Sequence, residues 1–237
     1  MKISVCVPMY NESSIIANTA RELHEYMTKH YGNDFELLFA DDGSRDGSGD
    51  IVKALNLPNV RVVGYEKNQG KGCAVRHGIL ASLGDIVIFT DADLAYGIEI
   101  ITKAVEIIEN GEYKVVVASR AKHREGYEGY TFIRKLASRT YIKIINLFGG
   151  IKISDSQCGL KAFDGEMGRK IFSYCKTNNF AFDLEVILIA QKMKLAIYEL
   201  PAKIINHRQS KVNVVKDAFR MMKEITVIKK NISKIDF

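Results

Sequence analysis

The chain has 237 residues, of which 47% are hydrophobic, so it can bury one substantial core and its length does not require a second domain. Its formal net charge of +6 suits anionic partners such as phosphates or acidic lipid, without identifying either. Charged residues such as Lys143, Asp183 and Glu185 interrupt the most apolar stretches. None of these stretches reaches the roughly 18 to 20 residues that a membrane-spanning helix needs. We therefore expect a chain that does not cross a membrane.

The predicted strands are rich in Val and Ile and fall at residues 3–7, 37–40, 60–65, 86–90 and 115–118. Helical segments separate them, with starts expected near residues 13–14, 46–48, 70–72 and 97–99. Such crossovers are long enough to make the strands pair in parallel. We predict an α/β fold with a doubly wound, mostly parallel sheet flanked by helices, which binds ligands beyond the carboxyl ends of its strands.

The second half of the chain is less regular. We expect helices at residues 131–148, 165–174 and 182–192, a short segment at 159–163 and a strand at 203–206. A terminal helix should begin near Val212. We find no internal repeat, and we divide the chain into one domain at residues 1–211 and a C-terminal basic amphipathic helix at 212–237.

The cysteines are Cys6, Cys73, Cys158 and Cys175, which lie far apart and form no C-x-x-C pair. No secretory leader precedes the first predicted strand, so we expect free, buried thiols in a reduced, cytoplasmic chain. The histidines show no metal-ligand spacing, and we interpret them as structural.

The first strand is followed by residues 8–12, without a G-x-G-x-x-G motif, which disfavours a nicotinamide or flavin site. Asn68-Gln69-Gly70-Lys71-Gly72 resembles part of a P-loop but lacks the full spacing. The second strand ends in Asp41-Asp42-Gly43. This pattern by itself favours an ordinary turn, and a carboxylate here could also accept hydrogen bonds from a base and a ribose.

Asp91-Ala92-Asp93 is the strongest signal, because it directly follows the apolar strand at residues 86–90. Two carboxylates at that spacing can converge on one divalent ion, which in turn binds a diphosphate. Oxygen ligands favour Mg²⁺ or Mn²⁺ over Zn²⁺. We therefore predict that Asp91 and Asp93 are metal ligands.

Together these motifs resemble the family 2 glycosyltransferases of the GT-A fold, and more narrowly the dolichyl-phosphate glucose and mannose synthases. The motifs that carry the resemblance are residues 7–12, 41–46, 68–72, 91–94, 119–120, 155–161, 182–185 and 207–211. They occur in the family's order and cover nearly the whole chain. They are specific for fold and reaction class, and much less so for the sugar.

The resemblance implies a site in several parts. The residues that would bind the nucleotide-sugar are Pro8, Tyr10, Glu12, Asp41, Asp42, Lys71, Asp91, Ala92, Asp93, Arg208 and Lys211. The acceptor phosphate would contact Arg120, Arg134 and Ser138. The catalytic set would be Asp91, Asp93, Asp155, Gln157 and Arg208, with Arg208 and Lys211 closing over the phosphates.

One departure bears on the donor. Mannose synthases often have a Gln as third metal ligand two residues after the second Asp, and this chain has Ala95 there, as in the glucosyl branch. UDP-glucose is therefore favoured, with GDP-mannose next. Residues 95–97 also lack the Pro that is usual in this loop.

The expected reaction is inverting transfer of a hexose to a polyprenyl or dolichyl phosphate. A phosphate monoester has a second pKa of about 6, so it is largely ionised near neutrality and needs no general base. A saccharide or protein hydroxyl acceptor would need one, and Asp155 is the candidate, although Asp155 and Gln157 could equally fix their loop. A third alternative is a nucleotide-sugar binding protein without turnover.

Two basic amphipathic stretches, at residues 133–148 and from 215 onward, bear on the remaining partners. Such helices can lie on an anionic membrane, which would make the protein peripheral on the cytoplasmic membrane face. They can equally pack against the sheet or a second subunit, so a homodimer remains an alternative. We expect no nucleic-acid partner.

Overall fold

The computed structural model describes residues 1–128, 135, 140, 142–143, 146–206 and 214–236, without the side chains of 214–223. Its seven-stranded sheet has the order β3-β2-β1-β4-β6-β5-β7. The strands are β1 (Ile3–Met9), β2 (Phe35–Asp41), β3 (Val60–Gly64), β4 (Ile86–Thr90), β5 (Val115–Ser119), β6 (Leu160–Asp164) and β7 (Ile197–Pro201). The helices are α1 (Ile16–Tyr31), α2 (Ser48–Ala54), α3 (Lys71–Leu80), α4 (Glu99–Glu109), α6 (Gly165–Tyr174), α7 (Phe182–Lys192) and α8 (Val214–Ser233), with a short 3₁₀ helix at Arg120–Lys122.

The sheet is mostly parallel, as predicted. β1 pairs in parallel with β2 and β4, β2 with β3, and β5 with β7. β6 alone is antiparallel, and it lies between β4 and β5. The carboxyl ends of β1, β2 and β4 consequently meet at one edge of the sheet, where an open α/β fold binds its ligands.

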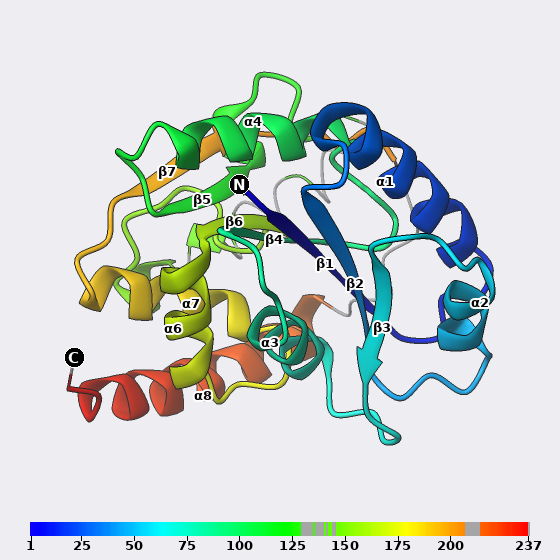
Figure 1. Cartoon of the computed structure of the whole chain (residues 1–237). Helices are drawn as coiled ribbons and strands as arrows, with labels where there is room; N and C mark the ends of the chain where they lie inside the picture. Colours follow the sequence, from blue (N-terminus) through cyan, green and yellow to red (C-terminus); the bar gives the residue numbers. More distant parts are fainter. Residues whose placement is uncertain (129–134, 136–139, 141, 144–145, 207–213, 237) are drawn as a thin grey trace.

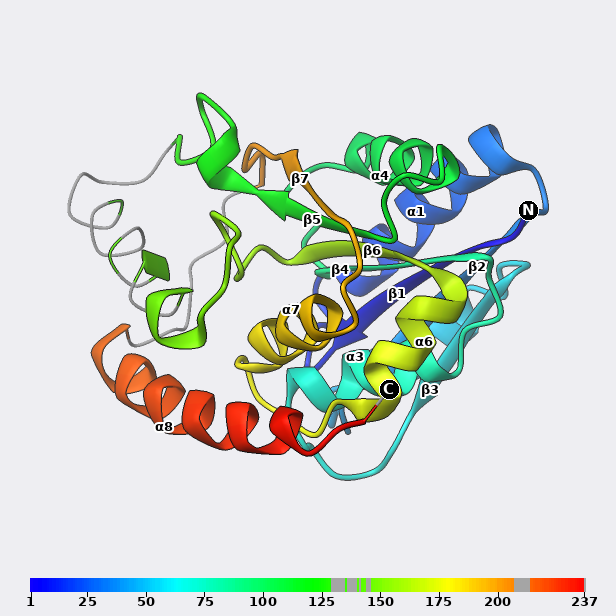
Figure 2. The same ribbon diagram turned by 90° about the vertical axis from the view of Figure 1, so that its left-hand side faces the viewer.

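Helices cover both faces of the sheet, and the sheet separates two apolar clusters (Figures 1 and 2). In β1, Val5 and Val7 face the cluster that contains α1 and α4, whereas Cys6 faces the cluster that contains α3, α6 and α7. Strands covered on both faces become continuously apolar, which is why the first predicted strands stood out in the sequence.

The C-terminal part of the chain differs from the prediction in one strand. Residues 203–206 are not a strand; the last strand is β7, which pairs with β5 from Val115↔Ile197 to Ser119↔Pro201. β7 lies at the edge of the sheet and is mostly half-buried, so its pattern is weakly apolar. Most of the predicted helix at 131–148 lies outside the described residues, although 146–149 are helical.

The four cysteines are free and buried, as predicted. Burial raises the pKa of Cys6 to about 12, which is the behaviour of an inert core thiol. No helix in the described part of the chain is both long and apolar enough to cross a bilayer.

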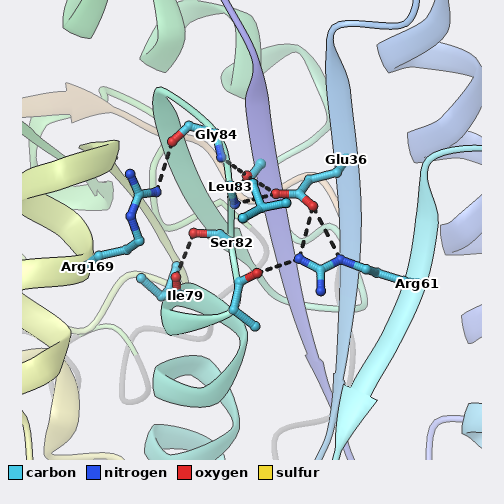
Figure 3. Close-up of polar contacts among 9 residues, drawn as sticks. Glu36, Arg61, Ile79, Ser82, Leu83, Gly84 and Arg169 are labelled. Atoms are coloured by element: carbon cyan, nitrogen blue, oxygen red, sulfur yellow. Dashed lines mark hydrogen bonds and ion pairs between the residues drawn. The ribbon is translucent and has the colours of Figure 1, made fainter.

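A buried carboxylate, Glu36, ties the amino ends of the strands together (Figure 3). It accepts hydrogen bonds from Ser4 Oγ at 2.6 Å, from the Leu83 backbone N–H at 2.6 Å and from Arg61 Nη2 at 3.1 Å. Ser4 Oγ in turn accepts from the Gly84 N–H at 2.8 Å. This network fixes the turn between α3 and β4 at the edge of the sheet opposite the candidate site.

Candidate functional site

The loops that follow β1 and β2 are joined by hydrogen bonds at the carboxyl edge of the sheet. The Asn11 N–H donates to Ser44 Oγ at 3.0 Å, and the Arg45 N–H donates to Asn11 Oδ1 at 2.9 Å. The Glu12 N–H donates to Ser48 Oγ at 2.9 Å. Asn11 has a φ of 54°, which Asn tolerates better than most residues. The two loops therefore form one corner of the site.

This corner brings together the residues predicted to hold the nucleoside. Pro8 is buried opposite Ala40 in the strand register, and Asp41 ends β2 opposite Met9. Asp41 Oδ1 accepts from the Ser44 N–H at 2.9 Å. Tyr10 is 45% exposed and Glu12 is half-buried. A large aromatic ring and a carboxylate at the end of neighbouring strands can contact the base and ribose of a nucleotide.

Asp42 faces inward and holds the next loop. Its carboxylate accepts from Tyr65 Oη at 2.7 Å, Asn68 Nδ2 at 2.8 Å, the Gln69 N–H at 2.8 Å and the Gly70 N–H at 2.9 Å. Asp42 is only 3% exposed. These contacts occupy its oxygens, so the geometry gives Asp42 the role of shaping the loop that leads into α3.

Asp91 follows β4, and its carboxylate is held from two sides. Lys71 Nζ, at the start of α3, lies 2.5 Å from Asp91 Oδ1. On the other side, Gly159 approaches so closely that a Cβ there would overlap Asp91 Oδ2. The side chain of Asp91 is still 31% exposed. A residue larger than glycine at position 159 would displace the Asp91 carboxylate from this position.

The rest of the Asp91–Asp93 loop is fixed by its backbone. Ala92 is buried, and its carbonyl accepts from Thr19 Oγ1 at 2.6 Å. Asp93 Oδ1 accepts from the Ala95 N–H at 3.1 Å, and Leu94 has a φ of 46°. Ala92 therefore anchors the loop through its carbonyl, between the two predicted metal ligands.

The two carboxylates fit a hard divalent cation. Among the described residues, no group of three or more His, Cys, Asp or Glu side chains is arranged to hold a metal ion. Mg²⁺ and similar ions are commonly bound by one or two carboxylates, with water and substrate phosphates completing the shell. The side chain of Asp91 is 31% exposed and Asp93 is half-buried, so both residues remain accessible to such an ion.

The chain leaving β7 crosses this loop. The Ile205 N–H donates to the Ala95 carbonyl at 2.8 Å, and Asn206 Nδ2 donates to the carbonyls of Asp93 and Leu94, each at 3.2 Å. The chain thus enters the segment 207–213 beside the acidic loop. Arg208 and Lys211 themselves lie outside the described residues.

Arg120 and Asp155, predicted for different tasks, form a buried ion pair. Asp155 is fully buried; Arg120 Nε lies 2.7 Å from its Oδ2, and Arg120 Nη2 lies 3.0 Å from its Oδ1. Asp155 Oδ1 also accepts from the Gln157 N–H at 3.2 Å. Arg120 lies over the Tyr127 ring at 5.6 Å. Arg134 and Ser138, the other predicted acceptor contacts, lie outside the described residues.

A second buried ion pair received no predicted role. Lys161, fully buried in β6, places its Nζ 2.5 Å from Asp183 Oδ1 in the first turn of α7, and it also donates to the Cys158 carbonyl at 3.0 Å. Burial raises the pKa of Asp183, and the charges of Lys161 and Lys71 offset only part of that rise. A lysine within an apolar strand was the available sequence signal, but its partner is 22 residues away.

This fold and site define a class: a mostly parallel sheet with an acidic pair at the end of a central strand, as in GT-A nucleotide-sugar transferases. Glucosyl-3-phosphoglycerate synthase from Mycobacterium tuberculosis, solved with Mn²⁺, UDP-glucose and phosphoglyceric acid, superposes with a TM-score of 0.71 and 21% identity over 99% of this chain and 81% of that chain. Mannosyl-3-phosphoglycerate synthase from Rubrobacter xylanophilus gives 0.64 and 18% over 97% and 73%. These structures establish the fold.

The family model described as Glycosyl transferase family 2 matches residues 4–172, and the chain belongs to this family. A dolichyl-phosphate beta-glucosyltransferase of Saccharomyces cerevisiae is 29% identical over 96% of this chain and 74% of its own length. Another, from Trichomonas vaginalis, is 33% identical over 83% of this chain and 62% of its own length. The sequence resemblance and the predicted fold are thereby confirmed.

Proposed function

We propose that the protein transfers a glucosyl residue from UDP-glucose to the phosphate of a dolichyl or other polyprenyl lipid, with inversion at the anomeric carbon. The observation that carries this proposal is the Asp91–Asp93 loop at the end of β4, beside the corner formed by the β1 and β2 loops. The names of relatives that cover most of this chain support the choice of sugar and acceptor.

The donor site follows from the positions of its residues. Tyr10, Glu12 and Asp41 would hold the nucleoside at the exposed corner. Asp91 and Asp93 would hold a Mg²⁺ or Mn²⁺ ion, which when bound would stabilise charge on the leaving diphosphate. Arg208 and Lys211 would add positive charge from the segment that begins after Asn206. Ala95, in place of a glutamine, favours UDP-glucose over GDP-mannose.

The acceptor is favoured to be a phosphate because the one candidate base is already engaged. Asp155 is fully buried and bound by Nε and Nη2 of Arg120, so it is poorly placed to accept a proton from a hydroxyl. An ionised phosphate monoester needs no such base. Arg120, Arg134 and Ser138 remain the proposed contacts of this phosphate.

We also propose peripheral attachment to the cytoplasmic face of a membrane. Leu147 is 81% exposed and Phe148 is 52% exposed, and Lys229 Nζ donates to the Phe148 carbonyl at 2.6 Å. Apolar side chains next to basic ones suit an anionic bilayer surface. The second predicted amphipathic stretch, from residue 215 onward, packs partly against the rest of the chain. Ile225 and Ile228 of α8 are buried in the apolar cluster that includes α7. A homodimer stays a prediction.

The reaction is tested by supplying labelled UDP-glucose, GDP-mannose or UDP-N-acetylglucosamine with Mn²⁺ or Mg²⁺ to liposomes that contain dolichyl or undecaprenyl phosphate. We expect label in the organic-extractable lipid from UDP-glucose, and its loss when EDTA removes the metal. Label found only in water-soluble products would contradict the lipid-phosphate acceptor.

Membrane attachment is tested by flotation. Liposomes with anionic lipid, floated through a density gradient, should carry the protein with them. Protein left at the bottom of the gradient would contradict membrane attachment.

A further inference from the structure

Lys71 stands on an unusually constrained piece of backbone. On one side of it, the Gly70 N–H donates to Asp42 Oδ2 at 2.9 Å; on the other, the Gly72 N–H donates to the Asn178 carbonyl at 2.7 Å. A Cβ at Gly72 would lie 2.6 Å from the Thr177 carbonyl oxygen, so the two loops are in direct contact. The backbone of Lys71 is therefore fixed in position, which restricts where its ammonium group can lie in the site.

The loop that supports Gly72 is itself held by α7. The backbone N–H groups of Lys176 and Thr177 donate to Glu185 Oε2 at 3.0 Å and 2.8 Å. Glu185 is almost fully buried. Asp42 and Glu185 lie outside the Asp91–Asp93 loop. Through these hydrogen bonds they fix the backbone position of Lys71.

The ammonium of Lys71 lies in the field of three carboxylates. It pairs directly with Asp91, and both Asp183 and Asp93 are near enough to act on it. Burial lowers the pKa of Lys71, but these carboxylates outweigh that effect and raise it overall. Asp183 already has a full partner in Lys161, whereas Asp91 has Lys71. Lys71 therefore neutralises the carboxylate that is proposed to receive a metal ion.

We infer that Lys71 is a resident counter-ion of the donor site, which pairs with Asp91 until a divalent cation and a nucleoside diphosphate bind together, and then contacts the diphosphate. The inference rests on the proposed function, because it takes a nucleotide-sugar as the ligand. Lys71 Nζ lies 2.5 Å from Asp91 Oδ1. A divalent cation bound to Asp91 would therefore be close enough to repel the Lys71 ammonium. A bound diphosphate offers Lys71 a new anionic partner.

Two consequences follow for binding. The cation alone has to displace Lys71 from Asp91, so it binds weakly without nucleotide. The nucleoside diphosphate removes that competition by drawing Lys71 to itself, and by reciprocity each ligand tightens the binding of the other. A lysine with a merely structural role would produce neither effect.

The test is Mn²⁺ binding by isothermal titration calorimetry to the native protein, Lys71→Met and Lys71→Gln, without nucleotide. We expect both variants to bind Mn²⁺ about fivefold more tightly or better, the lower end of typical coupling between ligands. Lys71→Arg, which keeps the charge, and Lys67→Met, an exposed lysine in the preceding loop, should bind Mn²⁺ as the native protein does. Denaturation curves identify which of the two neutral variants is folded.

A second titration measures UDP binding at saturating Mn²⁺, where Lys71→Met should bind about fivefold more weakly or worse. Equal or weaker Mn²⁺ binding by a folded neutral variant would overturn the counter-ion role. Unchanged UDP affinity would overturn the contact with the diphosphate. Because neither titration uses a sugar or a lipid, both can fail while glucosyl transfer by the native protein stands, and the reverse also holds.

Discussion

At the scale of single residues, the buried ion pair of Arg120 and Asp155 carries a stability prediction. We predict that Asp155→Asn lowers the free energy of unfolding by about 3 to 5 kcal/mol, because it leaves the buried Arg120 charge without a matching anion. Asp155 is fully buried and the side chain of Arg120 is only 10% exposed. Equilibrium urea denaturation measures the change. Asp50→Asn, in an exposed pair with Lys53, is the matched control and should unfold at the native midpoint.

A base role for Asp155 predicts a different result. Asp155→Asn would then keep native stability and lose transfer to a hydroxyl acceptor. That combination would revive the soluble-acceptor alternative and contradict the structural role of the Arg120 ion pair.

The two buried ion pairs could not be predicted from the sequence. Arg120 and Asp155 lie 35 residues apart, and Lys161 and Asp183 lie 22 residues apart, which no spacing rule connects. The position of Asp91 and Asp93 at a strand end was predictable because both directly follow one apolar strand; their metal binding stays a prediction. The nucleotide-sugar contact of Asp42 also stays a prediction, and its hydrogen bonds hold the loop that leads into α3.

The elements of the first half were predictable because each strand is apolar and is followed by residues typical of a helix start. β7 was misplaced because an edge strand needs less apolar sequence, and its pairing with β5 depends on contacts distant in the chain. The antiparallel insertion of β6 between β4 and β5 has the same cause. The hydrophobic periodicity of a segment indicates which of its side chains are buried, but it does not indicate which strand the segment pairs with.

At the scale of elements, Glu36 of β2 links β1, β3 and the turn before β4 through its hydrogen bonds. Burial raises the pKa of Glu36, but hydrogen bonds from Ser4, Leu83 and Arg61 outweigh that effect and hold the pKa below its ordinary value of 4.5. The stabilisation is therefore complete above that value and is lost as the pH falls through the folded-state pKa. The side chain of Arg61 is 41% exposed, so solvent weakens its share, and most of the effect should come from Ser4 and Leu83.

We expect Glu36→Gln to be about 1 to 3 kcal/mol less stable than the native protein at pH 7. The difference should shrink as the pH falls below 4.5, where Glu36 of the native protein becomes protonated. Urea denaturation at a series of pH values measures it, with the exposed Glu66→Gln as control. Parallel stability curves for Glu36→Gln and the native protein would refute the network's contribution.

For the whole molecule, fold and family could be predicted because several motifs occur in order along nearly the full chain, each at a strand end. The acceptor could be predicted only by resemblance. Two of its three proposed contacts, Arg134 and Ser138, lie outside the described residues, as do Arg208 and Lys211, the proposed contacts of the donor phosphates. The chain spans 74% of the length of the Saccharomyces cerevisiae relative and 62% of the length of the Trichomonas vaginalis relative.

We propose that the carboxylate pair after β4 supports glucosyl transfer to a lipid phosphate. The most direct test compares initial rates of label transfer from UDP-glucose to dolichyl phosphate for the native protein, Asp93→Asn and the exposed control Asp50→Asn, all shown to be folded. We predict that Asp93→Asn loses about 100-fold or more, as expected when stabilisation of a leaving group's charge is removed, while Asp50→Asn transfers at the native rate. An Asp93→Asn rate within a few-fold of native would contradict a role for this carboxylate pair in the transfer.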